Sequence, residues 1–166
     1  MTRPTAYHQL GKFIADFQHI ETALVDLLFL VSDSSNFEST SALIINLGYS
    51  QLLKTADVMF AMFIDSKKES NLSDKEDFHK LMDRLAQLGK RRNELVHSSY
   101  MRWINVDGDH GLIRKNLKRD GQRCQEEELL PEAFNKDLEA LSSASQNLEK
   151  FRLKVIDYLY PDVINN

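Results

Sequence analysis

The stretch GKRRNELVHSSYMRW, residues 89–103, contains the point at which this chain changes from helical to strand-like patterning. Up to residue 96, apolar residues recur at steps of three and four, the spacing of an amphipathic helix; they are Phe78, Leu81, Met82, Leu85, Leu88, Leu95 and Val96. After it come alternating residues in YMRWINV, the turn-forming DGDHG and a candidate returning strand in LIRKNLK. The stretch therefore predicts the end of a long helix followed by a small β-hairpin.

The same apolar spacing predicts further helices on both sides of this stretch. Long helices are expected over residues 4–31 and 51–64, with a short helix over 39–47 between them. A last helix is expected from an apolar stripe that runs from Phe134 to Leu159. Ser50 is expected to cap the second long helix, and Ser73 with Glu76 has the spacing of a capping box for the third. The acidic run QEEELLPE is expected to lead into the last helix.

The fold class follows from these helices and from a scarcity of turn-forming residues. The chain of 166 residues has 6 Gly and 3 Pro, too few for the many turns of a β-sandwich or barrel. Amphipathic helices joined by short loops bury their apolar faces against one another. We predict an all-α fold in a single domain over residues 1–166: an antiparallel four-to-five-helix bundle with a small β-hairpin inserted before the last long helix.

Charge and cysteine content limit the classes of function and location. The net charge of −4 disfavours a non-specific nucleic-acid coat, although basic residues gather between residues 90 and 123. The single cysteine, Cys124, cannot form an intrachain disulfide, which suggests a reducing compartment. No secretion signal is visible, and the apolar run ALVDLLFLV is interrupted by Asp26 and is too short to span a bilayer. A cytoplasmic protein without a membrane partner is expected.

Two charged residues interrupt apolar stripes. Helical steps from Leu81 reach Arg92, and helical steps from Leu10 reach Glu21. Burying an unpaired charge costs several kcal/mol, so either Glu21 and Arg92 form an ion pair between helices, or each lies at a stripe edge and reaches solvent. Arg92 also begins a polar cluster, because Asn93 and His97 are four residues apart and share one helical face. A histidine there could act as a general acid or base near neutral pH.

The motif Arg92-Asn93-x-x-x-His97 in a helical chain resembles the HEPN (higher eukaryote and prokaryote nucleotide-binding) domain family. FQHIETALVDLLF looks like the first helix of that family and LGYSQLLKTADVMF like its second, so the resemblance covers nearly the whole chain, with the short motif as its sharp part. It implies an all-α homodimer that acts as a metal-independent endoribonuclease in a toxin–antitoxin or phage-defence setting. Other members are inactive modules that bind a nucleotide or act beside a nucleotidyltransferase.

The resemblance implies that Arg92 and His97 are catalytic and that Asn93 orients them, with no metal or other cofactor. RNA would be the substrate, and an antitoxin or a nucleotidyltransferase a further partner. Flanking phosphates could be held by the basic residues Lys90, Arg91, Arg102, Arg114, Lys115, Lys118 and Arg119. Tyr100 or Trp103 could stack an unpaired base. The alternatives are a solvated charged hairpin with packing aromatics, an inactive binding module, or a structural dimer in which the cluster only organises the helix end.

Overall fold

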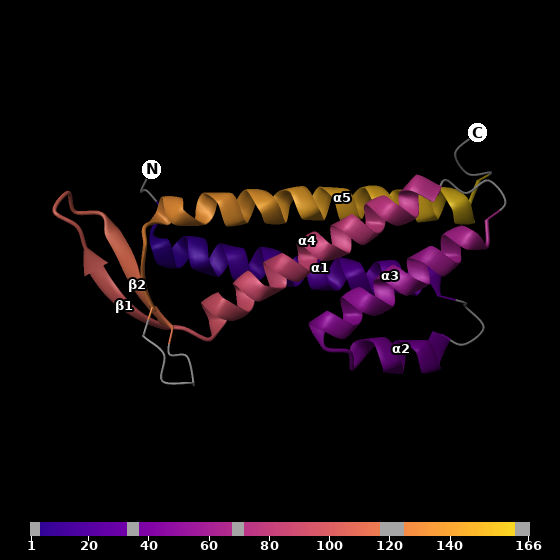
Figure 1. Cartoon of the computed structure of the whole chain (residues 1–166), viewed down its shortest axis with the longest axis horizontal. Helices are drawn as coiled ribbons and strands as arrows, with labels where there is room; N and C mark the ends of the chain where they lie inside the picture. The colour runs from indigo at the N-terminus through magenta and orange to yellow at the C-terminus, as the bar shows by residue number, and fades with distance from the viewer. Residues whose placement is uncertain (1–3, 33–36, 68–71, 117–124, 162–166) are drawn as a thin grey trace. The chain divides into compact units, whose positions relative to one another are not determined.

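The computed structural model describes residues 4–32, 37–67, 72–116 and 125–161 (Figure 1). Its elements, in chain order, are α1 (Ala6–Val31), α2 (Phe37–Ile45), α3 (Tyr49–Asp65), α4 (Leu72–Val96), β1 (Ser99–Ile104), β2 (His110–Asn116), β3 (Gln125–Leu129), the 3₁₀ turn η2 (Pro131–Phe134) and α5 (Asn135–Leu159). Four long helices with a small sheet before the last of them confirm the predicted fold class. Within the described residues, every helix is too short or too polar to span a bilayer.

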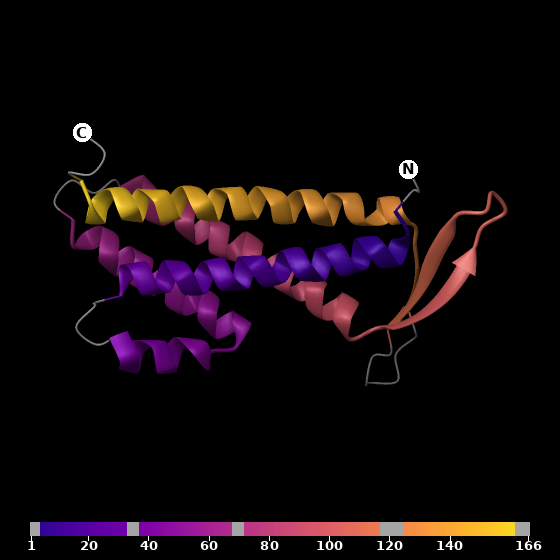
Figure 2. The ribbon, with the colours of Figure 1, turned by 180° about the vertical axis from the view of Figure 1, so that it is seen from behind.

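Two of the predicted helix starts are wrong. Ser50 lies inside α3, whose N-cap is Gly48; the carbonyl of Gly48 accepts the backbone N–H of Gln51 and Leu52, and no side chain caps the helix. The short connection from α2 into α3 is visible in Figure 2. Ser73 likewise lies within α4, which begins at Leu72, because the helical backbone extends ahead of the capping-box serine. Helix ends depend on a few backbone hydrogen bonds and are the least predictable part of a helix.

The chain forms two compact units. One unit contains residues 1–18 and 90–142, and the other contains residues 19–89 and 143–166. Helices α1, α4 and α5 each contribute to both units.

Three phenylalanines whose rings contact one another form the centre of the unit that contains residues 19–89 and 143–166. The ring of Phe60 in α3 lies 4.1 Å from that of Phe78 in α4, and Phe151 of α5 meets both edge-on at 5.4 and 5.1 Å. The same unit contains apolar side chains of α1 that are almost inaccessible to solvent: Ile20, Leu24, Leu27 and Leu28. Parts of all four long helices thus share one core, because each buries its apolar stripe there.

Gly89 is a point of close approach between α4 and α3. A Cβ atom added at Gly89 would lie 2.5 Å from Cε1 of Tyr49, whose hydroxyl donates a 2.9 Å hydrogen bond to the carbonyl of Leu85. We expect Gly89→Ala to lower the free energy of unfolding by about 1–3 kcal/mol, because the held ring must move. Gly11 of α1 is the matched control: its added Cβ meets nothing within 4 Å, so Gly11→Ala should raise stability by about 0.5–1 kcal/mol. Urea unfolding measures both; equal effects of the two substitutions would contradict the Tyr49 contact.

His79 in α4 forms an ion pair with Asp57 of α3, with Nδ1 and Oδ2 2.6 Å apart. The hydrogen bond to Asp57 and its charge, with a smaller contribution from Asp83, raise the pKa of His79 above its ordinary value. A raised pKa means that the pair stabilises the fold below the ordinary histidine pKa, and that this contribution is lost as pH rises through the folded-state pKa. NMR titration should show Asp57→Asn returning the pKa of His79 toward its ordinary value. An unchanged midpoint would refute the pairing.

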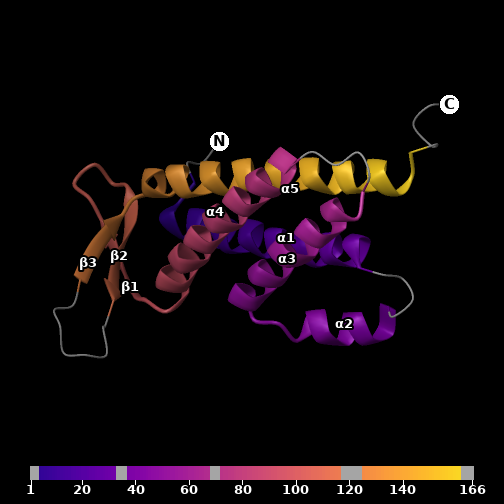
Figure 3. The same ribbon diagram turned by 45° about the vertical axis from the view of Figure 1, so that its right-hand side comes forward.

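The predicted β-hairpin is extended by a third strand. The sheet has the order β1-β2-β3 with both pairs antiparallel, and β3 is the segment that was expected to lead into the last helix (Figure 3). The acidic segment does precede the last helix, but its strand was not predicted, because it depends on the opposite charges of β2: Arg114 pairs with Glu127 and Lys115 with Glu126. Opposite charges directly across two strands stabilise their pairing. The hairpin between β1 and β2 is confirmed, with Gly108 in its turn at a φ of 82°.

Candidate functional site

The motif residues lie at the C-terminal end of α4. Arg92 and Asn93 occupy the last turns of the helix, and His97 follows its final residue, Val96. The backbone N–H of His97 donates a 3.0 Å hydrogen bond to the carbonyl of Asn93, so the helical pattern continues as far as the histidine. This bond fixes the position of the His97 backbone relative to Asn93.

Arg92 is held by one aromatic ring and one amide. Its guanidinium carbon lies 5.6 Å from the ring centre of the buried Phe17 in α1, and Nη1 donates a 3.0 Å hydrogen bond to Oδ1 of Asn93. An arginine over an aromatic face gains about 0.5–2 kcal/mol. Both contacts leave the positive charge without a carboxylate partner among the described residues of its own unit, so the guanidinium can still receive an anion.

His97 is exposed to solvent. Among the described residues, no side chain forms a hydrogen bond with its imidazole. The structure thus brings Arg92 into direct contact with Asn93 and links Asn93 to His97 through the backbone. An imidazole free at both nitrogens can exchange protons with a bound ligand.

Glu21, the predicted ionic partner of Arg92, belongs to the other unit of the chain, where it is half-buried in α1. The ion pair between them stays a prediction. The sequence suggested a carboxylate as the partner of an arginine on an apolar stripe. The structure shows that Arg92 contacts an aromatic ring, that of Phe17.

Arg91, one of the predicted phosphate-binding residues, lies among three carboxylates. Its Nε donates a 2.9 Å hydrogen bond to Asp137 at the start of α5, and its terminal nitrogens lie 3.6 Å from Glu127 and 3.5 Å from Glu94. Burial alone would lower the pKa of Arg91, but Asp137 and Glu127 outweigh it and raise that pKa. Arg91 joins α4 to β3 and α5, and its charge is already balanced within the protein.

Arg114 and Lys115 of β2 are also paired within the sheet. Arg114 is buried at 7% exposure, with Nε 2.7 Å from Oε2 of Glu127, although the N–H is not aligned for a hydrogen bond. Lys115 lies 2.7 Å from Glu126. A buried, paired arginine must leave its partner before it can bind a phosphate, so the geometry favours a role for Arg114 in holding β3. The phosphate-binding role of both residues stays a prediction.

Lys90 and Arg102 are exposed, so among the predicted phosphate-binding residues that the structure describes they are the most accessible to a phosphate group of an RNA in solution. Arg102 lies with its guanidinium carbon 5.2 Å from the ring centre of Tyr7 in α1, which leaves its charge open in the same manner as that of Arg92. Lys118 and Arg119, also predicted to bind phosphate, and Cys124 lie outside the described residues.

Both predicted base-stacking residues are half-buried. The hydroxyl of Tyr100 donates a 2.6 Å hydrogen bond to the carbonyl of Leu95, and burial raises its pKa although the nearby Arg114 and Arg91 favour the phenolate. Trp103 packs against Gly111 on the neighbouring strand, where any Cβ would collide with its indole ring. Tyr100 therefore ties the first strand to the end of α4, and base stacking by either ring stays a prediction.

No protein-family model, no curated protein and no solved structure matches this chain. The resemblance to HEPN domains therefore stays a prediction from the sequence.

Three residues around the motif were not singled out from the sequence: Phe17, Glu127 and Asp137. Phe17 is the first residue of the segment FQHIETALVDLLF, and nothing in the neighbouring sequence marks its ring as a contact of an arginine. The acidic run at residues 126–128, opposite a basic strand, was the available signal for Glu127. Within the described residues, no group of three or more His, Cys, Asp or Glu side chains is arranged to hold a metal ion.

Proposed function

We propose that this chain is a metal-independent endoribonuclease of HEPN type, in which Arg92 and His97 act on the RNA backbone. The observation that carries the proposal is the arrangement at the end of α4: an exposed imidazole follows Asn93 by one helical turn, and the amide of Asn93 accepts a hydrogen bond from Arg92. The stacking of Arg92 on Phe17 would hold the guanidinium in place before substrate binds.

The reaction needs little from the protein because RNA carries its own nucleophile. The 2′-hydroxyl loses a proton and attacks the adjacent phosphorus, the bond to the 5′-oxygen breaks, and that oxygen takes up a proton. The products are a 2′,3′-cyclic phosphate and a 5′-hydroxyl. His97 can transfer one of these protons, and Arg92 can stabilise the additional negative charge on the phosphate oxygens with two parallel N–H donors.

One histidine cannot readily serve as base and acid in the same step. A homodimer that brings two copies of His97 to one phosphate would supply both groups, and we include that dimer in the proposal. A toxin–antitoxin or phage-defence role in the cytoplasm, with an antitoxin as partner, is the corresponding biological proposal.

The test is incubation of purified protein with single-stranded and structured RNA in excess EDTA. The expected result is cleavage in the chelator, with 2′,3′-cyclic phosphate and 5′-hydroxyl ends. The matched control is an oligonucleotide that carries one 2′-deoxy nucleotide at the mapped cleavage site, which should resist cleavage there. Cleavage of the deoxy substrate, or a strict requirement for a divalent metal, would contradict the proposed chemistry.

A second function, an inactive helical dimer that binds a nucleotide or a protein such as a nucleotidyltransferase, is favoured by one observation. Arg91, Arg114 and Lys115 are paired with carboxylates of this same chain, which leaves fewer free cations for RNA. Inertness toward all RNAs tested, with unchanged folding, would favour this module over the nuclease.

A further inference from the structure

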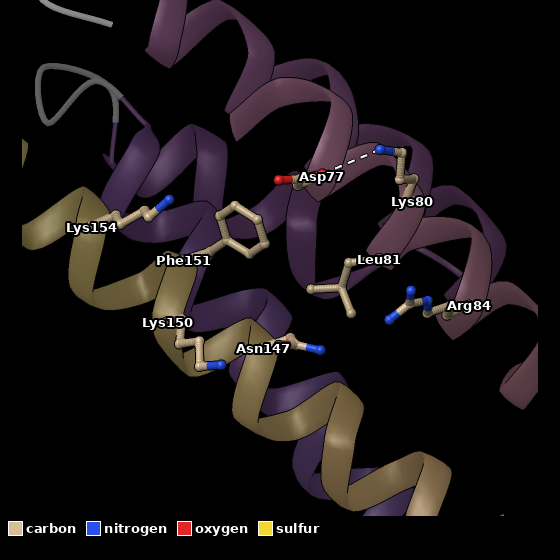
Figure 4. Close-up of a pocket in the computed structure, with 8 residues that line it drawn as sticks. All are labelled: Asp77, Lys80, Leu81, Arg84, Asn147, Lys150, Phe151 and Lys154. Atoms are coloured by element: carbon tan, nitrogen blue, oxygen red, sulfur yellow. Dashed lines mark hydrogen bonds and ion pairs between the residues drawn. The ribbon is translucent and has the colours of Figure 1, made fainter. Parts of the chain in front are cut away.

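A groove between α4 and α5 lies in the unit that contains residues 19–89 and 143–166, and the motif at the end of α4 does not include it. Its volume is about 300 Å³ (Figure 4). Leu81 of α4 and Phe151 of α5 form an apolar floor, and polar side chains of both helices surround it. A concave site with an apolar base and a few converging polar groups is the usual form of a small-molecule site, and this volume is at the lower end of the range for such sites.

The charges along the groove are unequal at its two ends. At one end, Lys80 lies 3.2 Å from Asp77, and Lys154 is paired with Asp74. Those two cations are therefore already neutralised. An anion at this end would also meet the carboxylate of Asp77, which lines the groove.

At the other end, Arg84 of α4 and Lys150 of α5 are exposed, and no carboxylate of the described residues pairs with either. Figure 4 shows the guanidinium of Arg84 and the amide of Asn147 directed toward each other across the groove, with the amine of Lys150 beside Asn147. Two unpaired cations and one amide that can donate hydrogen bonds converge there from two helices. A set of this kind can donate hydrogen bonds to closely spaced negative oxygens.

We propose that this groove binds a compact polyanion with adjacent phosphate groups, held by Arg84, Lys150 and Asn147. A compact ligand fits better than an extended strand because Asp77 would repel a phosphate chain that continued along the groove. Leu81 and Phe151, which are 3% and 8% exposed, offer a small apolar surface to any organic part attached to the phosphates. The inference concerns residues outside the nuclease proposal and does not depend on it.

The test is calorimetric titration of the full chain with inorganic triphosphate, ATP and adenosine at about 150 mM salt, where exposed charges more than about 8 Å apart are largely screened. Saturable binding of triphosphate is expected. Equal affinity for triphosphate and ATP would place recognition in the phosphates alone, and tighter binding of ATP would add a contribution from the apolar floor. Binding of adenosine without triphosphate, or no saturable binding of either phosphate compound, would overturn the proposal.

Variants identify the groove as the location. Arg84→Ala and Lys150→Ala should each weaken triphosphate binding by about tenfold or more, as expected for loss of a hydrogen bond from a charged donor. Lys54→Ala, which removes an exposed lysine of α3 in the same unit, is the matched control and should leave binding within about twofold. Unchanged affinity in the double variant Arg84→Ala/Lys150→Ala would overturn the assignment. So would binding of a single-stranded RNA that requires both residues while triphosphate does not bind, since the groove would then be a strand site.

Discussion

His97→Ala is expected to lower the rate of RNA cleavage by about 10²–10⁴-fold, the contribution of one positioned general acid or base. The imidazole is exposed, so its removal should leave the free energy of unfolding nearly unchanged. The measurement is the single-turnover rate on the mapped RNA site in EDTA, together with urea unfolding of the same preparation. A large loss of rate without a loss of stability is the signature of a group that acts on substrate.

The control for this substitution is His19→Ala, which removes another exposed histidine that the proposed reaction does not use. It should cleave RNA at the rate of the unaltered protein. If His97→Ala and His19→Ala cleaved equally fast, the nuclease would either use other residues or be a contaminant, and the role given to His97 would be wrong.

Arg92→Lys separates charge from geometry at the same site. Lysine keeps the positive charge but lacks the planar fork that can donate two parallel hydrogen bonds to a phosphate and also stack on Phe17. We expect a loss of rate approaching that of removing one transition-state donor, about 10²–10³-fold. An unaltered rate in Arg92→Lys would show that only the charge matters, and the paired contacts to Phe17 and Asn93 would then have no part in catalysis.

The helices of this chain were predictable because their information is local. Apolar residues three and four apart place a stripe on one face whatever the stripe packs against, and the hairpin is marked by its own alternation and its turn around Gly108. The third strand was not predictable in that way. QEEEL has no alternation of apolar and polar residues, and its pairing depends on Arg114 and Lys115, which lie on the neighbouring strand.

The candidate site was likewise predictable only where its residues are close together in the sequence. Arg92, Asn93 and His97 are near one another in sequence, so a helix end alone brings them together. The residues that support or neutralise the basic groups are distant in sequence: Phe17 lies under Arg92, and Asp137 binds Arg91. Sequence spacing could nominate arginines as phosphate ligands, but it could not show that Arg91 already has a partner in α5.

Phe78→Ala is expected to cause the largest loss of stability of the substitutions proposed for this chain, about 3–5 kcal/mol. Phe78 is fully buried, its ring lies 4.1 Å from that of Phe60, and Phe151 meets it edge-on at 5.1 Å. Alanine would remove the buried ring and its contacts with Phe60 and Phe151, and would leave a cavity between three helices. Because domains are stable by only about 5–15 kcal/mol, this single change should shift the urea midpoint far toward zero denaturant.

Phe78→Leu is the control that keeps most of the volume, and it should cost about 1.5 kcal/mol or less if the neighbouring rings can adjust. If Phe78→Ala and Phe78→Leu lowered the free energy of unfolding equally, the site would tolerate a cavity, and the three rings would not form the closely packed cluster described.

The same variants also test whether stability and cleavage rate are independent. His97 belongs to the other unit, so under conditions where Phe78→Leu stays folded, its RNA cleavage rate should equal that of the unaltered protein.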